Sequence, residues 1–308
     1  VGGQGDVEFL KHVHVLQGAV RGSLSPEGEV MLVMVSSRPG SEVDFASDFL
    51  QNFVCWLKLA RIPSYLLFAM DAHSYEQAQQ RGLVAIRGDH LLRTWLSEVQ
   101  GAHGQTRVIA NWDQMIKVKP VLAHLVLEYA SEALNGLIVS DMDVVWFRNP
   151  FSVLRKYAAS VDAVFSDEGA GVANTGVYYV KTTPGARKGM MTWAGMCLDE
   201  LANSALHDQD IFNQRVYLQV WPGVVICPES VVANGDKATE VGFHGFRLSK
   251  SLLALHVNKM WGTDVKVERL KKMGLFLADH MPNGQSPGGG KPNLCLRPAE
   301  AILPFLGD

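Results

Sequence analysis

Short apolar runs alternate with longer amphipathic stretches along the first half of the chain. The apolar runs lie at residues 30–35, 65–70, 107–110 and 137–140. Runs of this length predict buried strands, and the stretches between them are long enough for helices. Because strands that alternate with helices pair in parallel through crossover connections, we expect an α/β fold with a mostly parallel sheet flanked by helices.

Apolar spacing and proline place the helices. One helix is expected at residues 45–59 and another from Pro184 to near Asn203. The helix before the fourth strand is expected to begin at Pro120, because proline suits the first helical position. Lys119 would then lie at the positive end of that helix, where a cation is unfavourable unless an anion lies opposite. Lys119 is therefore a candidate nucleotide or phosphate contact, with a solvated lysine as the alternative.

Composition and charge restrict the class of protein. The 308 residues are 47% hydrophobic and 19% charged, which is ordinary for a globular protein and too apolar for a disordered one. The net charge of -3 offers no basic surface, so no nucleic-acid partner is expected. No apolar run in the sequence approaches the roughly 18 residues that span a bilayer. The four cysteines form no CxxC pair and say little about compartment. No Asn-x-Ser/Thr sequon occurs, which leans weakly toward a protein that is not glycosylated.

Two aspartates directly follow the fourth predicted strand. Asp141 and Asp143 are two residues apart, and side chains at that spacing on a strand point the same way. Hard oxygen ligands of this kind suit Mg²⁺ or Mn²⁺, which take one or two carboxylates and complete their shell with water and phosphate oxygens. The pair therefore predicts a site for a metal-bound diphosphate at the carboxyl end of the strand. Asp208 and Asp210 form a second Asp-x-Asp, so the tripeptide alone is not specific.

The segment 137–150 resembles the DxD segment of nucleotide-diphospho-sugar transferases, especially glycosyltransferase family 77. Three later segments resemble further motifs of that family in the expected order: 174–180 its Asn-Thr-Gly strand, 208–213 its Asp-Gln-x-x-x-Asn segment, and 256–266 its late histidine and lysine motif. Taken alone, these three would be a turn, a helix cap and an ordinary histidine. The resemblance covers about residues 110–275.

The resemblance implies a GT-A fold, which is Rossmann-like, and retaining transfer of a sugar. The family holds plant xylosyl- and arabinosyltransferases and a protist galactosyltransferase. The implied donor is a UDP-sugar carrying galactose, xylose or arabinose, the implied cofactor is Mn²⁺ or Mg²⁺, and the implied acceptor is a hydroxyl of a glycan or glycoprotein. The candidate metal ligands are Asp141, Asp143 and His256, and the residues expected beside the transferred sugar are Asp208 and Gln209. The candidate contacts to the donor nucleotide are Asp141, Asn174, Thr175, Asn258, Gly262 and Lys266, together with Lys119 from the helix argument above.

One large domain is expected. Residues 1–29 would form an N-terminal segment of unknown role, 30–280 the catalytic domain, and 281–308 a Gly/Pro-rich loop and C-terminal segment. Within the catalytic domain, the nucleotide-binding half is expected at about 30–143 and the acceptor-side half at about 144–280. Because related enzymes are mostly Golgi membrane proteins, we expect a Golgi-lumen protein with its type II anchor outside this sequence, in preference to the cytoplasmic branch of the family.

Two other interpretations stay open. An apolar strand followed by Asp-Met-Asp-Val-Val also fits the nucleophile motif of haloacid-dehalogenase-like phosphatases, with Gly235-Asp236 and Glu240 as a distal acidic motif. Against it, that nucleophile usually opens the chain, whereas at least two βα units precede it here. The other alternative is a non-catalytic nucleotide-sugar binder that keeps the fold without turnover.

Overall fold

The computed structural model describes residues 4–37, 49–100, 112–130, 132–203, 205–235, 252–258, 262–278 and 295. The predicted strand 107–110, the Gly-rich stretch 282–293 and the acidic residues Asp236 and Glu240 lie outside this part of the chain.

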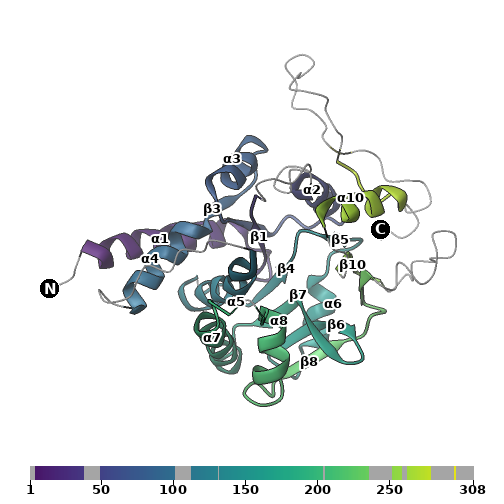
Figure 1. The fold of residues 1–308 in the computed structure, drawn as a ribbon. Helices are drawn as coiled ribbons and strands as arrows, with labels where there is room; N and C mark the ends of the chain where they lie inside the picture. The colour runs from purple at the N-terminus through teal and green to yellow at the C-terminus, as the bar shows by residue number, and fades with distance from the viewer. Residues whose placement is uncertain are drawn as a thin grey trace.

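A seven-stranded sheet forms the centre of the molecule (Figure 1). Its strands are β1 (Glu29–Val35), β2 (Tyr65–Ala69), β3 (Ala85–Arg87), β4 (Gly136–Ser140), β6 (Ala163–Gly169), β7 (Val172–Lys181) and β8 (Val224–Cys227). The order is β3-β2-β1-β4-β7-β6-β8, and only β7 runs antiparallel to its neighbours. The predicted α/β fold with a mostly parallel sheet is confirmed.

Helices cover both faces of this sheet. One face packs against α1 (Gln4–Ser23), α4 (Gly88–Gln100), α5 (Trp112–Tyr129) and α7 (Pro184–Asp199). The other face packs against α2 (Leu50–Leu59), α3 (Ala72–Gln80) and α6 (Phe151–Tyr157). Successive side chains of a strand point to opposite faces, so Val139 of β4 enters the first core and Ile138 the second. The apolar runs that predicted the strands are continuous because both faces are buried.

A second sheet of three short strands lies beside β4. Its strands are β5 (Val144–Trp146), β9 (Val232–Ala233) and β10 (Ala254–His256). The central strand β10 is antiparallel to β5 and parallel to β9. The helix α10 (Thr263–Lys272) follows it and shares a third core with α2 and this sheet. In Figure 1, α10 lies next to α2, so the late part of the chain returns to the early part.

Helix α5 differs from the prediction, because it begins at Trp112 and contains Pro120 in its interior. A proline there removes one backbone hydrogen bond and costs about 3 kcal/mol. Val118, Val121 and Leu122 around it are fully buried, and this apolar burial offsets the cost. Lys119 therefore does not lie at a helix N-terminus, and the helix-dipole reason for choosing it is wrong.

The other helix predictions are closer. Helix α7 begins at Pro184 as predicted, where the Oγ1 atom of Thr183 accepts a hydrogen bond of 3.1 Å from the backbone N–H of Ala186. Within the predicted helix 45–59, α2 covers Leu50–Leu59, and residues 45–48 are outside the described part. Helix α1 lies inside the predicted N-terminal segment 1–29 and contributes Leu16 and Val20 to the first core. The predicted domain limits stay predictions.

A disulfide between Cys55 of α2 and Cys295 joins residues that are 240 positions apart. The cysteine spacing had not indicated this bond. Two hydrogen bonds join α2 to the residues that follow α10: the indole Nε1 of Trp56 donates to the carbonyl of Leu275 at 2.8 Å, and Oδ1 of Asn52 accepts from the backbone N–H of Leu277 at 2.6 Å. Within the part of the chain that the structure describes, no helix combines the length and the hydrophobicity that a membrane span requires.

Candidate metal centre

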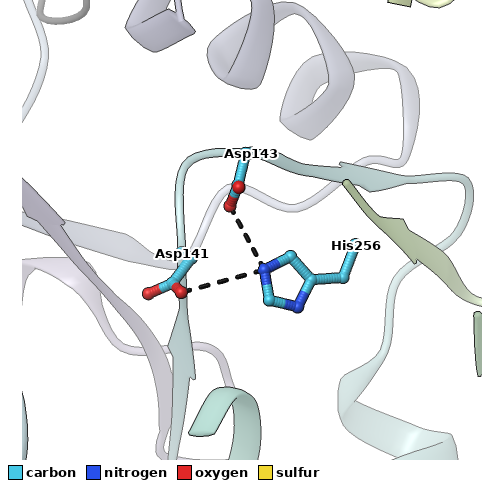
Figure 2. Close-up of side chains that lie close together, drawn as sticks. All are labelled: Asp141, Asp143 and His256. Carbon is cyan, nitrogen blue, oxygen red and sulfur yellow. Dashed lines mark ion pairs between the residues drawn. The ribbon is translucent and has the colours of Figure 1, made fainter. Parts of the chain in front are cut away.

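Three potential metal ligands meet where the two sheets adjoin (Figure 2). Asp141, Asp143 and His256 each place a ligand atom within 4.8 Å of the others. The Nε2 atom of His256 lies 3.3 Å from Oδ1 of Asp143 and 3.8 Å from Oδ2 of Asp141. The pairing of His256 with Val144 across β10 and β5 brings the imidazole to the two aspartates. The convergence of these three residues agrees with the predicted metal site.

The two aspartates lie in a turn and not on a strand. Strand β4 ends at Ser140, and Asp141 and Asp143 precede β5. The hydroxyl of Ser140 accepts from Nε1 of Trp146 at 3.1 Å and donates to the carbonyl of Asp141 at 3.0 Å, so it holds the turn. The side chain of Asp141 is 34% exposed and that of Asp143 is 8% exposed. The expected strand geometry is therefore wrong, and the turn makes the carboxylates converge.

Gly176 leaves the space that the centre needs. A Cβ atom at this position of β7 would lie 2.2 Å from Cε1 of His256 and 2.7 Å from Oδ2 of Asp141. Both distances are far below van der Waals contact, so a side chain here would displace one ligand or the other. The close approach of His256 and Asp141 therefore explains why the predicted Asn-Thr-Gly segment has a glycine at position 176.

Lys119 joins two carboxylates of the site. Its Nζ atom lies 3.0 Å from Oδ1 of Asp141 and 3.5 Å from Oδ2 of Asp208. Burial would lower the pKa of Lys119, but the two carboxylates outweigh it and raise the pKa above its ordinary value. Burial also raises the pKa of Asp208, and the Lys119 ammonium opposes this rise. Lys119 thus lies in the site for a reason other than the predicted one.

Lys266 supplies a second cation, from the first turns of α10. Its Nζ atom is ion-paired with Oδ2 of Asp143. Burial opposes the charged form of Asp143, yet Lys266 and His256 hold its pKa below the ordinary value. Gly262, directly before α10, has φ +100°, a backbone conformation that side-chain-bearing residues rarely adopt. This turn places the N-terminus of α10 and Lys266 beside the aspartates.

The Asn-Thr-Gly and Asp-Gln segments are hydrogen-bonded to each other. The side chain of Gln209 accepts from the backbone N–H of Thr175 at 3.2 Å. The amide of Asn213 donates to the carbonyl of Ala173 at 2.8 Å and accepts from its N–H at 2.9 Å. These bonds attach the short helix α8 (Asp208–Ile211) and the π-helical turn that follows it (Phe212–Val216) to the first residues of β7. They explain why two motifs far apart in the sequence lie in one site.

A cleft of about 350 Å³ brings the predicted residues together. It is lined by all of them: Lys119, Asp141, Asp143, Asn174, Thr175, Asp208, Gln209, His256, Asn258, Gly262 and Lys266. It also contains Ser36, Glu168, His207 and Asp210, whose place in the site was not predicted. Ser36 directly follows β1, and this position at the carboxyl end of a parallel strand is a signal that could have identified it from the sequence. Glu168 had no comparable signal, because the strand β6 that carries it had not been predicted.

The residues present fit a divalent metal. Two carboxylates and an imidazole are suitable ligands for Mn²⁺ or Mg²⁺, and the missing side chain at Gly176 leaves room for them to meet. Asp141 and Asp143 already face Lys119 and Lys266, as expected of a site that accommodates positive charge.

Comparison with known proteins identifies relatives of this chain. The family model described as nucleotide-diphospho-sugar transferase matches residues 60–270, which include all three candidate ligands. The beta-arabinofuranosyltransferase RAY1 of Arabidopsis thaliana is 28% identical over 175 residues, or 54% of this chain and 30% of that protein. The arabinosyltransferase XEG113 of the same plant is 25% identical over 276 residues, or 79% of this chain and 40% of that protein. The chain therefore spans less than half the length of these curated relatives.

A solved structure supports the fold. The galactosyltransferase LgtC, crystallised with donor and acceptor sugar analogues, superposes with a TM-score of 0.50 over 83% of this chain and 98% of that chain. The sequence identity is 11%, so this similarity concerns the fold alone.

Proposed function

Because this chain belongs to the nucleotide-diphospho-sugar transferase family and has a GT-A-type fold, we propose that it is a metal-dependent glycosyltransferase. It takes a sugar from a nucleotide-diphosphate donor and transfers it to a hydroxyl of a glycan or glycoprotein. The observation that carries this proposal is the convergence of Asp141, Asp143 and His256 in a cleft with two lysines. The family match also argues against the phosphatase interpretation.

The residues around the metal centre bind the diphosphate of the donor. Asp141, Asp143 and His256 would hold Mn²⁺ or Mg²⁺, which when bound supplies positive charge to the leaving group. Lys266 donates charge-assisted hydrogen bonds to the phosphates, for which it leaves Asp143. The first N–H groups of α10, behind Gly262, are suited to the same anion.

Residues on the opposite side of the cleft bind the transferred sugar. Asn174, Asp208 and Gln209 orient it, and Lys119 keeps Asp208 paired while no donor is bound. In the transfer, the bond between the anomeric carbon and the diphosphate oxygen breaks. The acceptor oxygen bonds to the anomeric carbon on the same face, and its proton passes to the departing diphosphate. The product therefore keeps the donor's anomeric configuration.

The donor is a UDP-sugar, and the sugars to compare are arabinose, xylose and galactose. Arabinose comes first because both curated relatives are named as arabinosyltransferases. The test is incubation with each UDP-sugar and Mn²⁺, measurement of released UDP, and proton NMR of the anomeric coupling in the product. An inverted product would contradict the retaining mechanism. Donor binding without any turnover would favour the non-catalytic binder.

Asp208→Asn tests the sugar side separately. Its proposed contacts are to the sugar and the transition state, so it should slow transfer much more than it weakens UDP binding. Transfer by Asp208→Asn at the wild-type rate would show that Asp208 does not orient the sugar and has only a structural role at the start of helix α8.

The Golgi lumen is the proposed location, with a membrane anchor outside this sequence. The Cys55–Cys295 disulfide supports it, because disulfides persist in oxidising compartments. Mass spectrometry of the protein from the cells that produce it, with free thiols blocked at lysis, tests the location. Cys55 and Cys295 recovered as free thiols would contradict it.

A further inference from the structure

Glu168 connects the two sheets at the cleft. It lies in β6 near its end, and its Oε2 atom accepts hydrogen bonds from the amide nitrogens of Asn174 and, at 2.8 Å, of Asn258. Asn174 belongs to β7 of the large sheet, whereas Asn258 follows β10 of the small sheet. One carboxylate oxygen therefore joins the sugar side of the site to the segment that carries His256.

The orientation of both amides is determined by backbone donors. The Oδ1 atom of Asn174 accepts from the N–H of Gly176 at 2.8 Å, and Oδ1 of Asn258 accepts from the N–H of Gly235 at 2.7 Å. Since a backbone N–H only donates, each amide must direct its nitrogen to Glu168. The arrangement requires an acceptor at Glu168 that reaches both nitrogens at once.

The backbone around Glu168 supports this placement. Gly169, Ala170 and Gly171 have φ values of +118°, +55° and +77°, and positive φ is unfavourable for a residue with a side chain such as Ala170. The Oδ1 atom of Asp167 accepts from the N–H groups of Gly169 at 2.8 Å and of Gly171 at 3.2 Å, which stabilises the turn. This turn returns the chain into β7, so that Glu168 faces Asn174.

A third bond attaches the neighbouring segment to the same residue. The amide nitrogen of Asn234 donates to the carbonyl of Glu168 at 3.1 Å. The next residue, Gly235, packs so closely that a Cβ atom there would lie 2.3 Å from the carbonyl oxygen of Asn258. The segments around Asn234 and Asn258 are therefore held against Glu168 together, and His256 is only two residues before Asn258.

We propose that Glu168 is a positioning residue, which holds Asn174 and Asn258 in place and thereby sets the position of His256 at the metal centre. This inference rests on the proposed function. The role of Glu168 depends on the length of its side chain and on its capacity to accept hydrogen bonds from both amides, and not on a negative charge that acts on the substrate. A residue that orients metal ligands in this way typically affects metal affinity roughly 10- to 100-fold.

Two conservative variants separate reach from charge. Glu168→Gln keeps the length of the side chain and one acceptor oxygen but removes the charge. Glu168→Asp keeps the charge, but its side chain is shorter by one methylene group. Mn²⁺ binding by the full chain with saturating UDP is measured from the free Mn²⁺ signal in electron paramagnetic resonance. We expect Glu168→Asp to bind Mn²⁺ roughly 10- to 100-fold more weakly and Glu168→Gln to stay close to the wild type. Melting temperatures of both variants should stay near the wild-type value.

The opposite ranking, with Glu168→Gln weaker than Glu168→Asp, would overturn the inference in favour of a charge effect. Wild-type affinity in both variants would overturn it as well, while leaving the proposed function intact. A wild-type protein that binds UDP without any effect of Mn²⁺ would contradict the proposed metal site itself, and the role of Glu168 with it.

Discussion

At the scale of the residue, Asp143 is the more enclosed of the two aspartates at the metal centre. One of its oxygens faces His256 and the other Lys266, and its side chain is 8% exposed. Replacement by asparagine keeps the shape but removes the charge that a metal and Lys266 both use. The arrangement therefore allows a test of metal binding with little change in packing.

We predict that Asp143→Asn abolishes the strengthening of UDP binding by Mn²⁺, because one of two carboxylate ligands loses its charge. Titration calorimetry of UDP with and without Mn²⁺ measures the effect. Asp199→Asn, an exposed position at the end of α7, is the matched control and should behave as the wild type. Uridine should bind equally with and without Mn²⁺. An undiminished Mn²⁺ effect in Asp143→Asn would exclude this residue as a ligand.

Gly176→Ala should also impair the centre, although it changes no ligand. The added methyl group would overlap Cε1 of His256, so the imidazole must move away from the aspartates. We expect a loss of Mn²⁺ affinity of roughly 10- to 100-fold, comparable to other changes around metal ligands. Gly195→Ala in α7 is the control, because a Cβ atom there meets no atom within 4 Å. Equal Mn²⁺ affinity in the two variants would contradict the steric argument.

At the scale of the element, three elements meet at a buried carboxylate far along the chain from the metal ligands. Glu29 begins β1 and is 1% exposed, and its Oε1 atom accepts from the hydroxyl of Tyr179 of β7 at 2.9 Å. Arg155 of α6 lies 3.6 Å from the other oxygen. Burial raises the pKa of Glu29 above its ordinary value, although Tyr179 and Arg155 oppose the rise, and nearby Glu27 adds to it.

A raised pKa in the folded state means that the fold favours the protonated carboxyl. The stabilisation is present at low pH and is lost as the pH rises through the folded pKa. Glu29→Gln keeps an acceptor for Tyr179 and removes the charge. We predict that its melting temperature equals that of the wild type in acid and exceeds it increasingly toward neutral pH. Glu8→Gln, exposed on α1, is the control. A Glu29→Gln variant that is less stable than the wild type at neutral pH would contradict the prediction.

At the scale of the whole molecule, the segment after α10 is attached to α2. The disulfide of Cys55 with Cys295 and the bond from Trp56 to Leu275 hold it there. Because α10 carries Lys266, this attachment also supports the position of a cation at the metal centre. Stability and the geometry of the site are thus connected through residues outside the cleft.

We predict that Cys295→Ser lowers the free energy of unfolding by about 2–4 kcal/mol, since the disulfide restricts the unfolded chain. Thermal melts with and without a reducing agent measure the difference. Reductant should lower the melting temperature of the wild type and leave Cys295→Ser unchanged, because Cys197 and Cys227 are free and buried. A wild-type melting temperature that does not respond to complete reduction would contradict a stabilising role of the bond.

Features that depend on neighbouring residues could be predicted from the amino-acid sequence. Strands β2 and β4 lie within one residue of their predicted limits, because a continuous apolar run has few other ways to bury both faces. The start of α7 at Pro184 was predicted from the proline, which suits the first helical position, and Thr183 caps the helix there. Asp141 and Asp143 were found because they directly follow a buried strand, and the resemblance of motifs added the later residues of the cleft.

How distant segments meet could not be predicted from the sequence, because it depends on packing across the whole fold. The interior position of Pro120 depends on burial of the surrounding helix, which no local rule for proline contains. The bond between Glu168 and Asn258 spans 90 residues, and the Cys55–Cys295 disulfide spans 240. Each such contact forms only when the whole chain has closed the loop between its partners. Local propensity therefore predicts strands and caps, whereas the packed fold selects which polar groups share a site.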